Sequence, residues 1–152
     1  MIYAYLLSIT AANLIIQHAG PQATIVTAFI FIGLDLVLRD KLHGKISSLK
    51  MFAMIAAAGL ITLAINAAAW QIAVASSLSF AVASIADWCV FARSGGSWSV
   101  RSYKSNLIGG IVDSVMFPTL AFGTIMPGIM IGQVAAKFFG GVVWVRLIGE
   151  NK

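Results

Sequence analysis

Charged side chains are scarce in this sequence. Its 152 residues include 10 Lys and Arg and 5 Asp and Glu, so that 10% of the chain is charged and 60% is apolar. A soluble domain carries roughly a quarter charged residues because its surface faces water. The composition therefore excludes an ordinary soluble domain. It predicts an all-α, polytopic membrane protein, and the length allows a single domain over residues 1–152.

Cysteine and histidine are also rare. The single Cys89 has no internal disulfide partner, and His18 and His43 are expected near opposite membrane faces. No Cys/His cluster has the spacing of zinc ligands. No GxxxxGK[ST] loop is present to bind the phosphates of ATP. Because neither a metal cluster nor a nucleophile–base pair is evident, we expect no metal, no cofactor and no enzymatic activity.

Six apolar runs make up most of the chain. They cover about 2–17, 22–38, 49–66, 70–92, 105–124 and 128–148. Most approach the roughly 20 residues with which a helix crosses a hydrocarbon core of about 30 Å. Polar Asn13 and Gln17 stand where a signal-peptide cleavage site would need small residues, so the first run is interpreted as a helix. The pattern predicts six transmembrane helices in one bundle.

The basic residues lie between alternate runs, and the other connections contain none. They are Arg39, Lys41, Lys45 and Lys50 after the second run, Arg93, Arg101 and Lys104 after the fourth, and Arg146 and Lys152 around the end of the sixth. By the positive-inside rule, this pattern predicts that both termini are cytoplasmic. Topology then explains the net charge of +5. We expect the chain to contact a lipid bilayer and no nucleic acid.

Four charged residues fall inside the apolar runs: Asp35, Asp87, Asp113 and Lys137. A charge at the bilayer centre costs roughly 2.5–3.5 kcal/mol, so such residues pair, line a cavity or bind a ligand. Counting from the nearest basic loop residues places both Asp113 and Lys137 roughly 13 Å from the cytoplasmic edge. An Asp113–Lys137 ion pair can therefore form if their helices are neighbours. It would either fix helix packing or belong to a polar substrate or coupling-ion site.

Polar and aromatic side chains accompany these charges at helical spacing. Asp35 and Arg39 are four residues apart, which predicts a structural ion pair on one helix. Asn106, Asp113 and Phe117 share a face of the fifth run, as do Gln133 and Lys137 in the sixth. The candidate substrate-binding residues are Asn13, Phe31, Asp35, Asp87, Asn106, Asp113, Phe117, Gln133 and Lys137.

The last two runs carry small residues and a proline. Gly128, Gly132, Ala136 and Gly140 recur every four residues, a stripe that lets another helix approach closely. In the fifth run Pro118 has no N–H, which leaves the carbonyl of Ser114 without its helical partner. Together with the Gly109–Gly110 pair, this proline predicts a weakened helix beside a cavity.

Carboxylates, an ammonium group, amides and aromatic rings suit a flat, nitrogen-rich ligand. A carboxylate can accept two N–H bonds from an amidine-like edge, such as that of a guanine-type base, while a ring stacks on the face of the base. A carboxylate that changes protonation could also couple transport to protons.

Several segments resemble one family, the queuosine precursor transporters, also called the VUT or vitamin uptake transporter family. They are Ile9–Leu14 (ITAANL), Phe29–Gly44 (FIFIGLDLVLRDKLHG), Ser84–Arg93 (SIADWCVFAR), Ser105–Gly123 (SNLIGGIVDSVMFPTLAFG) and Lys137 within GQVAAKFFGGVVW. The resemblance implies a six-helix inner-membrane importer of 7-deazaguanines, preQ0 or preQ1. It also implies that Asp35, Arg39, Asp87, Asn106, Asp113 and Lys137 match the recurrent polar positions of the family.

Three interpretations follow from these observations. The first is an importer that works as a secondary carrier. The second is a substrate-binding membrane subunit that needs a separate ATPase, a partner that no motif in the sequence indicates. The third is a structural or channel protein with a static Asp–Lys pair. No pattern predicts the oligomeric state.

Overall fold

The computed structural model describes residues 1–42 and 45–148, and within them the chain forms helices and no β-strand. His43 and Lys152 lie outside the described residues. The elements are α1 Ile2–Ala19, α2 Ala23–Thr27, η1 Ala28–Ile32, α3 Gly33–Leu42, α4 Ser48–Ile65, η2 Ala67–Ala69, α5 Trp70–Arg93, α6 Trp98–Phe122 and α7 Pro127–Ile148.

Five helical segments are long and apolar enough to cross a membrane: α1, α4, η2 with α5, α6 and α7. They correspond to five of the six predicted runs. The second run, 22–38, corresponds to an unbroken helical segment in three parts, α2, η1 and α3, of which η1 is a π-helix. This segment is not among the five.

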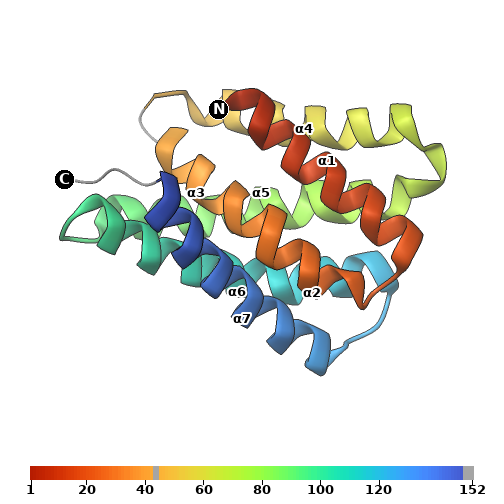
Figure 1. The fold of residues 1–152 in the computed structure, drawn as a ribbon. Coiled ribbons are helices and arrows are strands. Elements are labelled where there is room, and N and C mark those ends of the chain that lie inside the picture. Colours follow the sequence, from red (N-terminus) through yellow and green to blue (C-terminus); the bar gives the residue numbers. More distant parts are fainter. Residues whose placement is uncertain (43–44, 149–152) are drawn as a thin grey trace.

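The helices form a closed ring. Each packs against the next in the order α1, α4, α5, α6, α7, the α2–η1–α3 segment, and α1 again. Figure 1 shows that the chain runs up and down between two ends of this ring. The ends of α3, α5 and α7 lie at one end, and the α1–α2, α4–α5 and α6–α7 connections lie at the other. The end that holds the ends of α3, α5 and α7 is called the basic end below, because most Lys and Arg residues lie there.

Serine side chains begin the helices that start at the basic end. The hydroxyl of Ser47 accepts the N–H of Lys50 at 3.3 Å before α4, and that of Ser97 accepts the N–H of Val100 at 3.4 Å before α6. These are N-caps of the usual kind. Because of its cap, α6 begins at Trp98, well before residue 105, where the apolar run predicted a start.

Glycines let α7 approach the α2–η1–α3 segment closely. A Cβ at Gly140 would overlap the carbonyl oxygen of Phe29 in η1, and one at Gly33 would lie 2.7 Å from the carbonyl carbon of Gly140. A Cβ at Gly132 would lie 2.8 Å from Cδ1 of Ile25. Gly132 and Gly140 of the small-residue stripe therefore pack against the α2–η1–α3 segment; the sequence predicted such a close approach but not its partner.

The bundle is polar inside and apolar outside. Leu60, Ile131 and Phe139 are exposed, whereas Asp35, Asp113 and Lys137 are buried. Apolar side chains such as Tyr5, Ile9, Leu36 and Phe80 join α1, α3, α4 and α5 around this polar centre. A chain with this distribution is suited to a lipid environment, where apolar side chains can face outward without the free-energy penalty of contact with water.

Candidate functional site

Lys137 is the centre of a hydrogen-bonded cluster between α6 and α7. Its Nζ lies 2.6 Å from Oδ2 of Asp113 and donates to Oγ of Ser114 at 2.9 Å and to Oε1 of Gln133 at 2.8 Å. An ammonium group has three protons, so all its donors are used. The ion pair expected from equal depths in the bilayer is formed. Ser114 contributes its hydroxyl, and α6 continues as a helix through Pro118.

The cavity beside this cluster is very small. Its volume is about 20 Å³, which is room for about one water molecule. Predicted site residues that line it are Asn13, Asp113, Phe117, Gln133 and Lys137, together with Thr24 and Thr27 of α2. Asn13 is held there by α4, because its Nδ2 donates to Oγ1 of Thr62 at 3.2 Å. In this conformation the centre of the bundle is closed to any ligand larger than water.

Several buried polar atoms have no hydrogen-bond partner among the described residues. They include the hydroxyl of Tyr5, both carboxylate oxygens of Asp35, Nη2 of Arg39, Oδ1 of Asn106, Oδ1 of Asp113 and Nε2 of Gln133. Folded proteins satisfy the large majority of such groups. A concentration of unsatisfied donors and acceptors in one interior indicates a place that binds a polar ligand, water or protons.

Arg39 forms an ion pair with α5, and not with its own helix. Its Nε lies 3.3 Å from Oδ2 of Asp87, and its Nη1 donates to Oγ of Ser84 at 2.8 Å. The expected Asp35–Arg39 ion pair is not formed between these described residues. Arg39 is also buried, although the charge pattern placed it in a loop. The side chain reaches α5 because Ser84 supplies an acceptor and Gly109 leaves room for the guanidinium.

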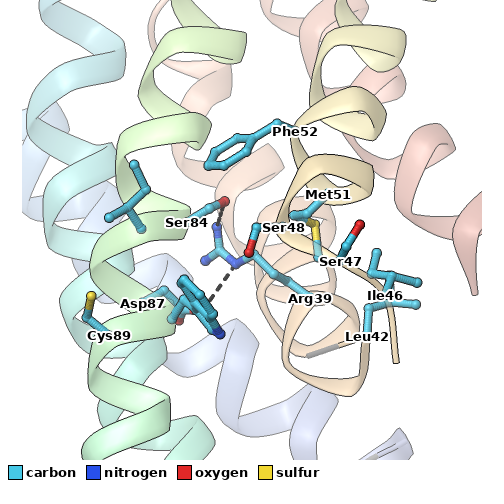
Figure 2. A pocket seen from close by; sticks show the side chains of 12 residues that line it. Arg39, Leu42, Ile46, Ser47, Ser48, Met51, Phe52, Ser84, Asp87 and Cys89 are labelled. Atoms are coloured by element: carbon cyan, nitrogen blue, oxygen red, sulfur yellow. Dashed lines mark hydrogen bonds and ion pairs between the residues drawn. The ribbon is translucent and has the colours of Figure 1, made fainter. Parts of the chain in front are cut away.

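The Arg39–Asp87 pair lies at the wall of a large pocket among α3, α4 and α5 (Figure 2). The pocket has a volume of about 560 Å³, within the range of small-molecule sites. Its other lining residues are Leu42, Ile46, Ser47, Ser48, Met51, Phe52, Ser84, Ile85, Trp88 and Cys89. These residues come from α3, the connection that follows it, the start of α4 and the last turns of α5, so the pocket lies toward the basic end.

Two consecutive glycines of α6 separate the two ion pairs. A Cβ at Gly109 would lie 3.0 Å from Cβ of Asp87 and 3.2 Å from Nη2 of Arg39, whereas one at Gly110 would lie 3.6 Å from Cβ of Lys137. Gly109 thus faces the pair at the pocket, and Gly110 faces the central cluster. One turn of α6 is in contact with both.

A further buried acid, Asp40, was missed at the level of sequence. It accepts hydrogen bonds from the hydroxyls of Ser102 and Ser105, the latter at 3.3 Å, and Nδ2 of Asn106 donates to Oγ of Ser102 at 3.2 Å. Asp40 lies between Arg39 and Lys41, which suggested a loop. The signal that could have found it is the spacing of Ser102, Ser105 and Asn106, which places all three on one face of α6.

The predicted site residues therefore fall into separate places. Asn13, Asp113, Phe117, Gln133 and Lys137 surround the small cavity, and Asp87 lines the pocket. Asn106 lies between α6 and α7, near Gly141. Asp35 is buried but lines neither space, and Phe31 packs on the apolar cluster around Tyr5 and Leu36. No group of three His, Cys, Asp or Glu in the described part of the chain could hold a metal ion.

Comparison with known proteins identifies a family. A family model described as "putative vitamin uptake transporter" matches residues 3–149. No curated protein and no solved structure matches the chain. The family match and the five apolar helices together indicate a multi-pass membrane protein that transports a small molecule.

Proposed function

Because the chain belongs to the vitamin uptake transporter family, we propose that it imports the 7-deazaguanine bases preQ0 or preQ1 for queuosine synthesis. The similarity of Phe29–Gly44, Ser84–Arg93 and Ser105–Gly123 to queuosine precursor transporters supports this substrate class. The protein works as a secondary carrier in the inner membrane and catalyses no reaction. Residues 1–152 act as one transport domain.

In this proposal the chain crosses the membrane six times. The α2–η1–α3 segment, second in chain order, is the span that joins the five apolar helices. It runs beside α1 and α7 between the same two ends of the ring. The basic end faces the cytoplasm, together with both termini, by the positive-inside rule. The pocket among α3, α4 and α5 is then a cytoplasmic-side site, from which an imported base is released.

The pocket is the observation that carries the proposal. It combines a carboxylate, a guanidinium and a hydroxyl, from Asp87, Arg39 and Ser84, with aromatic rings of Phe52 and Trp88. A deazaguanine base has N–H donors on one edge, a carbonyl acceptor and a flat face. Asp87 accepts from the N–H edge, Arg39 donates to the carbonyl, and Trp88 stacks on the ring.

Transport of the base requires the centre of the bundle to open. The small cavity admits about one water molecule, and the Asp113–Lys137 pair joins α6 to α7 beside it. Separation of α6 from α7 would expose Asp113, Gln133 and Lys137 to a passing base. These residues then bind the base in a second conformation, and the pair re-forms once the base has passed.

A complementation experiment tests this function. The chain is expressed in cells that have no precursor importer of their own and cannot make preQ0, and queuosine in tRNA is measured with nanomolar preQ0 supplied. We expect queuosine to be restored. No restoration by a well-expressed protein would contradict the proposal, and restoration only in hosts that contain a partner ATPase would favour the substrate-binding subunit.

A matched pair of tryptophan variants tests the pocket in the same cells. Trp88→Ala removes a ring that lines the pocket, whereas Trp70→Ala removes an exposed ring at the opposite end. Stacking of a base on an aromatic ring is worth about 1–3 kcal/mol, so Trp88→Ala should raise the preQ0 concentration needed by about tenfold. Trp70→Ala should not change it. Equal effects of both variants would exclude the pocket as the substrate site.

A further inference from the structure

The interior of the bundle holds more acids than cations. Four carboxylates and two cations of the described residues are buried: Asp35, Asp40, Asp87 and Asp113, against Arg39 and Lys137. Lys137 neutralises Asp113, and Arg39 neutralises Asp87. Asp40 accepts hydrogen bonds from two serine hydroxyls. The carboxyl group of Asp35 is left without a hydrogen-bond or ion-pair partner in the described part of the chain.

Asp35 is completely buried, and neither of its oxygens has a hydrogen-bond partner among the described residues. Charged and titratable groups from five helices interact with it electrostatically. They are Arg39 on its own helix, Tyr5 of α1, Asp87 of α5, Asp113 of α6 and Lys137 of α7. Both of these cations are already paired with another carboxylate, and the carboxylates of Asp87 and Asp113 oppose a negative charge on Asp35.

An unpaired carboxylate ion in such a place would be very unstable, because burial removes its hydration and nothing replaces it. The neutral acid costs far less. The conformation described here therefore suits a protonated Asp35, and a conformation in which Asp35 gains a cation or water suits the ion.

Arg39 can supply that cation with little movement. It lies one helical turn from Asp35, the spacing at which side chains on a helix meet. Its Nε lies 3.3 Å from Oδ2 of Asp87 and its Nη1 donates to Ser84 at 2.8 Å, whereas its Nη2 has no hydrogen-bond partner among the described residues. A rotation of the guanidinium would therefore exchange the Asp87 pair for an Asp35 pair.

We propose that Asp35 is the proton-binding site of the transport cycle, and that Arg39 alternates between Asp87 and Asp35 as this proton leaves and returns. This inference rests on the proposed function. One proton enters with each base from the outside, resides on Asp35 while the bundle is closed, and is released to the cytoplasm with the base. When Arg39 turns to the ionised Asp35, it leaves Asp87, so the proton on Asp35 controls the ion pairing at the wall of the pocket.

Transport into liposomes tests the coupling. The purified chain is reconstituted, the membrane potential is clamped at zero, and uptake of radiolabelled preQ0, which carries no charge, is measured with and without an inward proton gradient of one pH unit. For one proton per base, the gradient should drive up to about tenfold accumulation, since one pH unit and a tenfold concentration ratio are equal in free energy. Exchange of external for internal preQ0 is measured without any gradient.

Asp35→Asn, which resembles the protonated acid, should retain exchange and lose the gradient-driven accumulation. Asp35→Glu should restore at least part of the accumulation. Because the carboxylate has no partner to lose, Asp35→Asn should also unfold at no lower temperature than the original protein. Together these results would establish Asp35 as the coupling residue.

The other outcomes are distinguishable. Two results overturn the inference and leave the proposed function intact. One is full gradient-driven accumulation by Asp35→Asn, and the other is accumulation by the original chain that does not depend on the proton gradient. Loss of exchange in a stable Asp35→Asn means that Asp35 binds the base, and a large drop in its unfolding temperature means that Asp35 is structural. Either result overturns the inference. Absence of both exchange and accumulation in the original chain contradicts the proposed function itself.

Discussion

The ammonium group of Lys137 has a partner for each of its three protons, and Asp113 depends on it for a counter-ion. If Lys137 is replaced by Met, Asp113 keeps its burial and loses its counter-ion. Breaking a buried ion pair by removing one partner typically costs about 3–5 kcal/mol. We expect Lys137→Met to lower the unfolding temperature of the detergent-purified protein sharply and to abolish preQ0 uptake.

The double variant Asp113→Asn/Lys137→Met separates the two roles of this pair. It leaves no unpaired buried charge, so it should recover most of the stability that Lys137→Met loses. It should not recover uptake if Asp113 and Lys137 also bind the passing base. A double variant with both stability and uptake restored would reduce the pair to a packing device.

The close contact between α7 and η1 is a property of two elements, and one methyl group should disturb it. Gly140→Ala places a Cβ against the backbone of Phe29, which cannot move aside without the whole segment. Overpacking of this kind costs about 1–3 kcal/mol. Thermal unfolding should therefore show a clear loss of stability.

Gly128→Ala is the matched control on the same stripe. A Cβ at Gly128 meets nothing within 4 Å, and the change should stay within about 0.5 kcal/mol. If Gly128→Ala is as harmful as Gly140→Ala, the loss does not come from the contact with η1.

The glycine pair of α6 gives a second comparison between neighbours. Gly109→Ala crowds the Arg39–Asp87 pair, with contacts of 3.0 and 3.2 Å, whereas Gly110→Ala meets Lys137 at an ordinary 3.6 Å. A disturbance of about 1 kcal/mol at the pocket changes binding about fivefold. We expect Gly109→Ala to raise the preQ0 concentration for half-maximal uptake by at least that factor and Gly110→Ala to leave it nearly unchanged. The reverse order would place the substrate on the Lys137 side of α6.

At the scale of the whole molecule, Cys89 reports both orientation and pocket access. It is the only cysteine, it is partly buried, and it lines the pocket near the basic end. A membrane-impermeant maleimide should label it in inside-out vesicles and not in intact spheroplasts, and preQ0 should slow the labelling. Labelling from the outer face alone would reverse the proposed orientation.

The sequence predicts the helices well because hydrophobic length decides them. It also predicts the Asp113–Lys137 pair, since depth in a bilayer follows from counting residues along two neighbouring helices. The sequence does not predict the ion-pair partner of Arg39. Whether Arg39 pairs with Asp35 or with Asp87 depends on the space that Gly109 leaves on another helix. The burial of Asp40 was not predicted for a similar reason, because only the continuation of α3 to Leu42 turns its side chain toward Ser102 and Ser105.

The π-helical turn of η1 was also beyond prediction from periodicity, and it is contacted by residues of another helix. The indole Nε1 of Trp144 donates to the carbonyl of Ile30 at 2.9 Å, and Gly140 lies against Phe29. Neither contact leaves a trace in the spacing of apolar residues within 22–38. The Trp144 side chain is partly buried at this contact.

The π-helical turn gives the second span a rotational phase of its own. A π turn holds about one residue more than an α turn, so everything after η1 is turned by roughly 100° relative to an uninterrupted helix. That offset decides which way Asp35 and Arg39 face. Thr24 and Thr27 precede η1, so the offset does not affect them, and they line the small cavity. If η1 relaxed to α-helical geometry, α3 would rotate about its axis and carry both charged groups with it. The turn is thus a place where this span could change its register without breaking.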